Sequence, residues 1–337
     1  MTKIGIIGCG YWGPNLVRNF TELTNCEVAA VADLNKDRLS ALAARFPRLE
    51  GFSDYNKILQ NKDIEGVVIS TNLSTHFNIA KDALNAGKHI LLEKPVTPSV
   101  REAEELVELA KKNGLIFMSG HTFLYNKGVT DTKMYVDKGE IGDVLYLHAE
   151  RTNLGPIRHD TNAMWDLAPH DISIFIHIIG QLPLAVSAHG GSFLKKGRED
   201  VVFLTLKFPG GILGNVHVSW LDPCKTRKIT VIGNKKMLLF DDLNPLEPIK
   251  LFDKGVEYPK DYGSYGEFQH ILRDGDILIP KIKLSEPLKN ECAAFIESIT
   301  RKKNPLSDGE FGKKVVKVLC AAQRSLDKDG VLVEVSK

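Results

Sequence analysis

The stretch Gly8-Cys9-Gly10-Tyr11-Trp12-Gly13 decides the fold, because it has the spacing GxGxxG and follows the apolar run Lys3–Ile7. In this setting the first glycine makes a tight turn, the second lets the backbone approach a pyrophosphate, and the third allows close helix–strand packing. The N-terminus of the next helix would offer free N–H groups to the phosphates. The stretch therefore predicts a dinucleotide-binding turn; the alternative is a glycine-rich turn without a ligand.

Short apolar runs alternate with amphipathic segments over the first 120 residues, which is the signature of βαβ units. The helix after Ser99 is the best marked, since Ser99-Val100-Arg101-Glu102 forms a capping box and Asn113-Gly114 provides a stop. We expect residues 1–123 to form an NAD-binding Rossmann domain. Its expected strands are Lys3–Ile7, Val28–Ala32, Gly66–Ser70, His89–Leu92 and Ile116–Ser119.

The pattern changes after residue 123, and several strands separated by turn signals occupy Leu184 to Asp253. In the run Ile212–Leu221, apolar and polar residues alternate, which is typical of a strand with one buried face. Two helical patterns, Leu288–Arg301 and Gly309–Leu326, close the chain. We expect residues 124–337 to form a substrate-binding and oligomerisation domain. The predicted fold class is α/β, with a Rossmann domain and a C-terminal α/β domain that has an open, mainly antiparallel sheet.

Length and composition favour a two-domain cytoplasmic protein. The chain has 337 residues, a net charge of +2, and five scattered cysteines with no CxxC pair. So small a charge gives no reason to expect nucleic acid or a membrane as a partner. No charged-then-apolar leader and no membrane-length apolar run is present.

Asp33 closes the second expected strand, twenty residues after Gly13. An acidic side chain at this place can hydrogen-bond a ribose diol and would repel a 2′-phosphate, so the sequence favours NAD over NADP. Arg38 leaves NADP open as the alternative, because a nearby arginine can accommodate that phosphate.

Glu93-Lys94-Pro95 follows the apolar run that ends at Leu92. Ligands of open α/β sheets bind at the carboxyl ends of the strands, so Lys94 is expected to face the cofactor; the alternative is a surface lysine. Ser70-Thr71-Asn72 and His76 end another strand and suit contacts to the cofactor, or the N-cap of a helix.

Trp165-Asp166-Leu167-Ala168-Pro169-His170 is the second chemical centre, since Asp166 and His170 would share a helix face. Imidazole is well suited to move a proton near neutral pH, and a carboxylate can orient it. The alternative is a hydrogen-bonded core histidine. We read the remaining histidines that lack such a partner as structural, and we expect no metal site. Those histidines are His89, His148, His177, His189, His217 and His270.

A polar segment with two arginines, Arg151–His159, precedes this centre. Arginine recognises phosphate bidentately, which favours a phosphorylated substrate such as a nucleotide sugar. A solvated charged loop is the alternative.

The joint pattern of GxGxxG at residues 8–13, Asp33, Glu93-Lys94-Pro95 and Asp166…His170 resembles the glucose–fructose oxidoreductase / inositol dehydrogenase / MocA family over essentially the whole chain. The resemblance implies a Rossmann domain, an open-sheet domain that forms the subunit interface, and a homo-oligomer, either a dimer or a tetramer. It also implies that Lys94, Asp166 and His170 line the site where nicotinamide oxidises a sugar or polyol hydroxyl.

Three stretches resemble one branch of the family, the bacterial enzymes that oxidise the 3-hydroxyl of UDP-N-acetylglucosamine. They are Gly120–Asn126, Asn162–Ile172 and His217–Pro223. A pathway transaminase, which prepares the 3-amino sugar for lipid A, would then be a partner. The glycine-rich segment that many members carry before the aspartate is replaced by Ala163-Met164-Trp165. The alternatives are a dehydrogenase for another nucleotide sugar, a free sugar or an inositol, and a non-catalytic NAD-binding sensor.

These expectations name two sets of contacts. The expected cofactor contacts are Gly8, Gly10, Tyr11, Trp12, Gly13, Asp33, Leu34, Arg38, Ser70, Thr71, Asn72, His76, Glu93, Lys94, His121 and Trp165. The expected substrate contacts are Lys94, Tyr125, Asn153, Arg158, His159, Asn162, Asp166 and His170.

Overall fold

The computed structural model describes residues 1–257 and 271–335. The contacts divide the chain into two compact units, the first being Met1–Tyr125 with Ser285–Cys320 and the second Asn126–Leu284 with Ala321–Lys337. The sequence pattern placed all of 124–337 in one domain, whereas the structure groups Ser285–Cys320 with the first unit. Within the described residues, no helix combines the length and apolar character needed to cross a lipid bilayer.

The first unit contains a six-stranded parallel sheet with the order β3-β2-β1-β4-β5-β6, which confirms the Rossmann prediction. Its central strands are buried on both faces, as the apolar runs predicted. Five of the six strands agree with the predicted runs to within two residues. The strands are β1 (Thr2–Ile7), β2 (Cys26–Ala32), β3 (Glu50–Phe52), β4 (Gly66–Ile69), β5 (His89–Glu93) and β6 (Phe117–Gly120).

The helix after Ser99, α5 (Val100–Lys112), begins and ends where the local signals predict. The Ser99 hydroxyl accepts a hydrogen bond from the Glu102 N–H at 3.3 Å, and Gly114 takes a positive φ of 65° after the last turn. The helices are α1 (Gly13–Thr21), α2 (Lys36–Arg45), α3 (Asn56–Gln60), α4 (Leu73–Asn85), α5 (Val100–Lys112), the 3₁₀ turn η1 (Thr122–Tyr125), α8 (Pro287–Arg301) and the first part of α9 (Gly309–Leu326).

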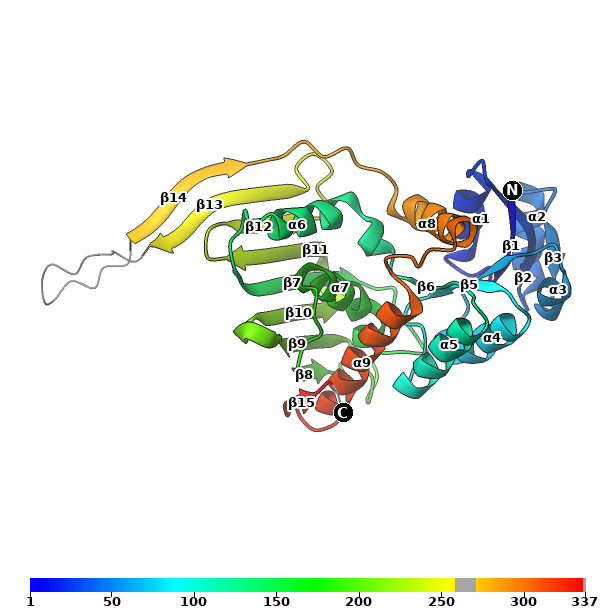
Figure 1. Ribbon diagram of the computed structural model, residues 1–337. Helices are drawn as coiled ribbons and strands as arrows, with labels where there is room; N and C mark the ends of the chain where they lie inside the picture. The colour runs from blue at the N-terminus through cyan, green and yellow to red at the C-terminus, as the bar shows by residue number, and fades with distance from the viewer. Residues whose placement is uncertain (258–270, 336–337) are drawn as a thin grey trace, which may run out of the picture. The chain divides into compact units, whose positions relative to one another are not determined.

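Helix α8 explains why a late segment belongs to the first unit. Its buried side chains share a core with those of α1, and the rings of Phe20 and Phe295 meet edge to face at 6.3 Å between centroids. Arg18 on α1 also pairs with Glu286, which caps α8. Figure 1 shows α8 (orange) beside α1 (blue), although the two are far apart in sequence.

The second unit contains a nine-stranded sheet with the order β14-β13-β12-β11-β7-β10-β9-β8-β15. Neighbouring strands are antiparallel except for β7 and β10, which confirms the predicted mainly antiparallel sheet. The strands are β7 (Val144–Leu154), β8 (Ala185–Gly191), β9 (Val201–Lys207), β10 (Leu213–Ser219), β11 (Leu221–Gly233), β12 (Met237–Asp241), β13 (Ile249–Glu257), β14 (Ile271–Leu278) and β15 (Val333–Glu334).

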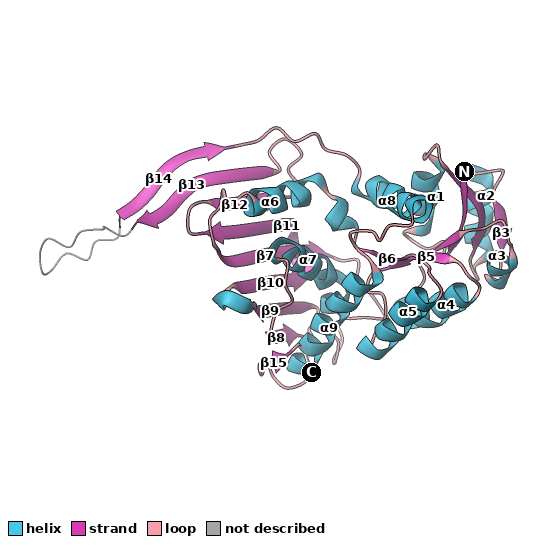
Figure 2. Cartoon of the chain, viewed as in Figure 1, coloured by secondary structure: helices cyan, strands magenta, loops and turns pink. Residues whose placement is uncertain are grey.

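Helices α6 (Lys127–Asp137) and α7 (Ala163–Ile179) lie across one face of this sheet, as Figure 2 shows. The 3₁₀ turn η2 (Pro209–Gly211) joins β9 and β10. Val216 and Val218 of β10 are buried on the covered face, and the predicted alternation along this strand is confirmed. Trp220 follows β10 directly and is also buried.

Strand β7 includes Arg151 and runs on to Leu154, so the start of the polar segment Arg151–His159 lies in the sheet. Arg151 is buried, and its guanidinium donates two hydrogen bonds, of 2.8 and 2.9 Å, to the carboxylate of buried Asp171. The prediction that Arg151 lies in an exposed polar loop is therefore wrong. The two hydrogen bonds to Asp171 occupy the N–H groups with which the Arg151 guanidinium would bind a phosphate.

Candidate active site

The glycine turn lies between β1 and α1 and leaves no room for side chains at two of its glycines. Gly8 has a φ of +98°, and a Cβ there would come within 2.6 Å of the Ser70 carbonyl oxygen. A Cβ at Gly13 would come within 2.5 Å of the Gly8 carbonyl oxygen. At Gly10 the nearest atom is Nη1 of Arg38 at 3.8 Å, so the backbone here is open to a ligand, as a pyrophosphate contact requires.

Asp33 is held against the glycine turn by backbone donors. Its Oδ2 accepts from the Cys9 N–H at 2.6 Å, and its Oδ1 accepts from the Asn35 N–H at 2.8 Å. Nη1 of Arg38 lies 3.5 Å from Oδ2. Burial and the Asp33 charge raise the pKa of Cys9 to about 12, so this thiol stays neutral at the turn.

The expected contacts around the glycine turn have exposed side chains. Tyr11, Trp12 and Leu34 are all exposed. These apolar side chains are not part of a core, so they are available to pack against a flat ring such as adenine.

The segment after β4 packs directly on the glycine turn. The Ser70 hydroxyl donates to the Gly8 carbonyl oxygen at 2.8 Å. Asn72 is the N-cap of α4, but the described structure shows no hydrogen bond from its side chain to the helix. The Thr75 hydroxyl donates to the Thr71 hydroxyl and the Asn72 carbonyl, each at 2.8 Å. Asn72 therefore occupies the N-cap position that the alternative for this segment predicted, but its side-chain amide takes no part in the cap.

Lys94 begins the turn that follows β5 and is half-buried. Its N–H donates to the carboxylate of Glu93 at 3.2 Å. Glu93 is paired with Gly120 across β5 and β6, and a Cβ at Gly120 would lie 3.2 Å from Oε2 of Glu93. A glycine at position 120 therefore leaves the space that the Glu93 side chain occupies.

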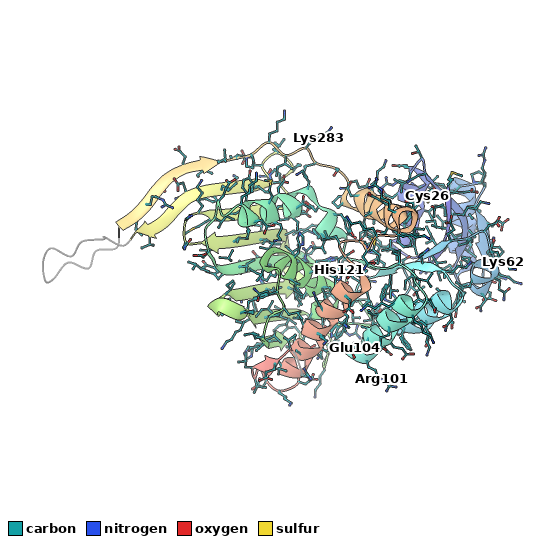
Figure 3. The ribbon with its side chains drawn as sticks, in the orientation of Figure 1. Cys26, Lys62, Arg101, Glu104, His121 and Lys283 are labelled. Atoms are coloured by element: carbon teal, nitrogen blue, oxygen red, sulfur yellow. The ribbon has the colours of Figure 1, made fainter. Side chains whose placement is uncertain are left out.

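Two further titratable groups are buried next to this turn. His121, labelled in Figure 3, is buried, and burial together with the Lys94 charge lowers its pKa to about 3. In the described part of the chain, neither of its ring nitrogens has a hydrogen-bond partner. Glu291 of α8 accepts from the Thr122 hydroxyl at 2.8 Å, and burial and the Glu93 charge raise its pKa well above the usual range.

Tyr125, an expected substrate contact, ends η1 in the first unit. Its hydroxyl shares a hydrogen bond of 3.0 Å with the Ser307 hydroxyl, and burial raises its pKa to about 12. The Asn290 side chain donates to the Tyr125 carbonyl oxygen at 3.0 Å. A contact between Tyr125 and the substrate stays a prediction.

In the second unit, helix α7 carries the Asp166–His170 pair. Asn162 caps this helix, since its Oδ1 accepts from the Trp165 N–H at 3.0 Å while its amide donates to Glu199 and Gln323. The Trp165 indole also donates to Gln323, at 3.0 Å. Both the oxygen and the nitrogen of the Asn162 side-chain amide therefore have hydrogen-bond partners within the second unit.

Asp166 has two donors that hold its carboxylate. The buried Trp220 indole N–H donates to Oδ2 at 3.2 Å, and Nε of Arg158 donates to Oδ1 at 3.4 Å. Trp220 itself is anchored by backbone hydrogen bonds to Asp200 and Gly155. His170 is half-buried one turn along α7, and its carbonyl oxygen accepts from the Ser173 hydroxyl.

The segment between β7 and α7 carries the remaining expected substrate contacts. The Asn153 amide donates to the Gly155 carbonyl oxygen, and the Arg158 carbonyl oxygen accepts from Arg198 at 2.6 Å. The Arg158 and His159 side chains are exposed. Of the two arginines considered for phosphate recognition, only Arg158 keeps an exposed guanidinium.

The two units hold different parts of the predicted site. Lys94 belongs to the first unit, with the glycine turn and Asp33, whereas Asp166 and His170 belong to the second. The sequence reasoning missed Glu291 and the part played by Trp220. An acidic residue on the apolar stripe of the helix pattern 288–301 was the available signal for Glu291, while nothing in the sequence joined Trp220 to Asp166.

The residues of the first unit fit a dinucleotide. The open backbone at Gly10, the positive φ of Gly8 and the fixed Asp33 carboxylate are the features that a pyrophosphate and a ribose diol require. In the described residues, no cluster of three or more His, Cys, Asp or Glu side chains could hold a metal ion. His270, one of the histidines expected to be structural, lies outside the described residues.

Comparison with known proteins agrees with this geometry. Residues 2–121 match the model of the oxidoreductase family with an NAD-binding Rossmann fold, GFO_IDH_MocA. Residues 129–239 match a C-terminal domain model of the same family.

Relatives with several activities match most of the chain. UDP-N-acetylglucosamine 3-dehydrogenase of Acidithiobacillus ferrooxidans is 26% identical, with 93% of this chain and 94% of that protein covered. Myo-inositol 2-dehydrogenase of Thermotoga maritima is 23% identical, with 97% and 96% covered. The solved structure of scyllo-inositol dehydrogenase from Lactobacillus casei with bound NAD(H) and scyllo-inositol has a TM-score of 0.83 at 19% identity and covers both chains fully, which shows a shared fold. The chain therefore belongs to the Gfo/Idh/MocA family of NAD-dependent oxidoreductases.

Proposed function

We propose that this protein oxidises the 3-hydroxyl of UDP-N-acetylglucosamine to the 3-keto sugar with NAD⁺. The observation that carries the proposal is the position of Lys94, which begins the turn after β5 in the unit that holds the glycine turn. Ligands of such sheets bind beyond the carboxyl ends of the strands, where a lysine can meet a reacting oxygen. An NAD-binding sensor would need the glycines and Asp33 but none of Lys94, Asp166 and His170.

The reaction breaks a C–H bond and an O–H bond of the sugar and forms a carbonyl group. When bound, NAD⁺ supplies the acceptor for the hydride. The hydroxyl proton must go to a base of the protein, so the chain needs one proton acceptor and one group that stabilises charge on the oxygen.

His170 is proposed as the general base, because imidazole accepts a proton efficiently near neutral pH. Asp166 is proposed to orient it, and Trp220 and Arg158 fix the carboxylate of Asp166. Lys94 is proposed to donate a hydrogen bond to the reacting oxygen and to stabilise the negative charge that develops there, an effect worth a few kcal/mol in a water-excluded site. Exchange of the roles of Lys94 and His170 is the alternative assignment.

A nucleotide sugar is supported by Arg158 and by the relative with this activity. The Arg158 guanidinium is exposed on the segment before α7, and its fork can bind a phosphate. The Acidithiobacillus ferrooxidans enzyme that matches this chain acts, by its name, on UDP-N-acetylglucosamine. A transaminase that consumes the 3-keto sugar, as in the formation of the 3-amino sugar of lipid A, would then act next.

An inositol is the second candidate substrate. The Thermotoga maritima myo-inositol 2-dehydrogenase matches as much of the chain as the nucleotide-sugar enzyme does. An inositol has no phosphate, so a protein specific for inositol has no use for Arg158 as a phosphate ligand. Arg158 also holds Asp166, so Arg158→Ala is expected to lower kcat with either substrate, and the two candidates are separated by KM, which should rise only for a substrate that carries a phosphate.

The test is reduction of NAD⁺, followed at the nicotinamide absorbance, with UDP-N-acetylglucosamine, UDP-N-acetylgalactosamine, myo-inositol and scyllo-inositol. A transaminase and an amino donor are added to the nucleotide-sugar reactions, because they remove the ketone and draw the equilibrium forward. The proposal predicts turnover of UDP-N-acetylglucosamine that Lys94→Ala nearly abolishes and for which Arg158→Ala raises KM. Turnover of an inositol alone, with a KM that Arg158→Ala leaves unchanged, would assign the protein to the second candidate.

A further inference from the structure

His76 is buried in the first turn of α4, and both of its ring nitrogens face backbone carbonyl oxygens. Nδ1 lies 2.9 Å from the carbonyl oxygen of Pro95, and Nε2 lies 3.1 Å from that of Thr71. The residue is only 2% exposed, so a bound cofactor has little access to its ring. The sequence predicted a cofactor contact for His76, whereas the structure gives its ring two partners inside the protein.

These two carbonyl groups belong to different parts of the predicted site. Thr71 lies in the segment that packs on the glycine turn, where a Cβ at Gly8 would come within 2.9 Å of the Thr71 nitrogen. Pro95 directly follows Lys94 in the turn after β5. The His76 ring therefore joins the backbone next to the glycine turn to the backbone that carries Lys94.

We propose that His76 is the positioning residue that sets Lys94 relative to the glycine turn, by bridging the Thr71 and Pro95 carbonyl groups. The inference rests on the proposed role of Lys94. The contact of the Lys94 N–H to the Glu93 side chain is made to its neighbour in sequence at the end of β5. The His76 ring instead connects the turn after β5 to the segment after β4, which packs on the glycine turn.

A neutral imidazole carries one N–H, so it can donate to only one of the two carbonyl groups at a time. Burial lowers the pKa of His76, and the Lys94 charge acts in the same direction, which favours the neutral ring. If the bond to Pro95 positions Lys94, the proton resides on Nδ1. An asparagine amide can replace a donor at Nδ1, whereas the longer glutamine amide reaches toward the Nε2 position.

The experiment compares His76→Phe, His76→Asn and His76→Gln with His89→Phe as the matched control. His89 begins β5, at the opposite end of the strand from Lys94, and its Nδ1 accepts from the Ile116 N–H at 2.8 Å. Its replacement removes a half-buried histidine with a backbone hydrogen bond from the same strand. The exposed Lys62, labelled in Figure 3, is the internal reference for amine labelling.

Two readouts are measured on the full-length protein. The first is acetylation of Lys94 by acetic anhydride, relative to Lys62, followed by mass spectrometry; it needs no substrate. The second is kcat and KM with NAD⁺ and UDP-N-acetylglucosamine, together with NADH affinity by fluorescence. We expect His76→Phe to change the relative labelling rate of Lys94 and to lower kcat by about 10- to 100-fold, with little change in NADH affinity, since small misplacements of a catalytic group cost about that much.

The variants His76→Asn and His76→Gln show to which carbonyl group the His76 ring donates its hydrogen bond. Recovery of labelling and kcat in His76→Asn, but not in His76→Gln, supports donation to Pro95. Wild-type labelling of Lys94 in His76→Phe overturns the inference, and so does an equal loss of kcat in His89→Phe. An equal loss of NADH affinity and kcat would also overturn it, because His76 would then act on the cofactor. If Lys94→Ala retains full activity while His76→Phe alters labelling, the proposed function of Lys94 has failed and the positioning inference has not.

Discussion

At Asp33, two backbone N–H groups hold a carboxylate at the place where a ribose would bind. A fixed negative charge there favours a ribose diol and repels a 2′-phosphate. We expect Asp33→Ser to lower the preference for NAD over NADP, because the repulsion disappears while Arg38 remains 3.8 Å from the space above Gly10. Binding of NADH and NADPH by fluorescence measures the ratio, with the exposed Asp37→Ser as the control. Equal affinity of the wild type for both cofactors would refute this reading of Asp33 and would move attention to Arg38.

The general base can be identified from the pH dependence of the rate. If His170 accepts the proton, His170→Ala should lower kcat by roughly two to four orders of magnitude and abolish the acidic limb of the pH–rate profile. Lys94→Ala should also be nearly inactive, but its remaining activity should keep that limb, because only charge stabilisation is lost. NAD affinity should barely change in His170→Ala. Loss of the limb in Lys94→Ala, with its retention in His170→Ala, would exchange the two roles.

Glu291 makes folding stability depend on pH. Burial and the Glu93 charge raise its pKa in the folded protein, so the folded state binds this proton more tightly than the unfolded chain does. The stability that the proton contributes is therefore complete below about pH 4.5, the ordinary pKa, and is lost as the pH rises toward the folded pKa, with a slope of at most about 1.4 kcal/mol per pH unit.

We expect Glu291→Gln to gain thermal stability relative to the wild type as the pH is raised from 5 to 8. A glutamine is neutral throughout this range and can keep the contact to Thr122. Thermal midpoints at several pH values test this, with Glu104→Gln on the exposed face of α5 as the control for the loss of one exposed carboxylate, which lies 3.9 Å from Lys317. A difference between Glu291→Gln and the wild type that stays constant with pH would show that folding does not raise the pKa of Glu291.

At the scale of elements, two helix caps allow an effect on folding stability to be distinguished from an effect on kcat. Ser99 caps α5, which the sequence marked clearly, and Asn162 caps α7, which carries Asp166 and His170. Replacing either cap with alanine should cost about 0.5–2 kcal/mol of stability. We expect only Asn162→Ala to lower kcat as well, because fraying of the first turn displaces Asp166. Thermal denaturation and kcat are measured together, and an equal loss of kcat in Ser99→Ala would remove the special role of the α7 cap.

Periodic, long elements were predictable from the sequence, whereas short ones were not. The Rossmann strands and α5 follow strong apolar patterns and a capping box, and the structure confirms them. Strand β3 has three residues and helix α3 has five, which is too short for a period to emerge from the sequence. Arg151 was misplaced because nothing local indicates that Asp171, twenty residues later, would bury it in an ion pair.

The sequence could predict where candidate site residues lie only if they follow a strand or belong to the glycine spacing. Gly8, Asp33 and Lys94 belong to this group, because strand ends in a parallel sheet converge on one edge. His76, Glu291 and Trp220 instead depend on contacts between residues that are distant in sequence or on backbone carbonyl groups, which no single-sequence pattern records.

At the scale of the whole molecule, the nine-stranded sheet has two different faces. The face under α6 and α7 carries buried aliphatic residues, including Val216 and Val218. The opposite face carries Tyr146, Phe203 and Leu213, which are 46–50% exposed, and the Phe203 ring stacks on His217 at 4.4 Å. Leu213 and Tyr146 are register partners on β10 and β7, and Phe203 lies on β9 beyond a polar row formed by Thr205, Asn215 and His148. Apolar and polar rows therefore alternate along this strip, which lies beside a hollow of about 350 Å³.

We expect this strip to be the contact through which the protein forms a homo-oligomer, either a dimer or a tetramer. Three large, half-exposed apolar side chains interleaved with polar ones on one face of a sheet have the mixed composition of a protein–protein interface. Phe203→Glu and Leu213→Glu should therefore shift the protein toward the monomer, because they place charges in the buried centre of the contact. Leu246→Glu is the matched control, since Leu246 is exposed in the turn between β12 and β13, away from the strip. Light scattering at micromolar concentration measures the mass; a monomeric wild type, or an oligomer that both strip variants leave intact, would show that the open face does not form the interface.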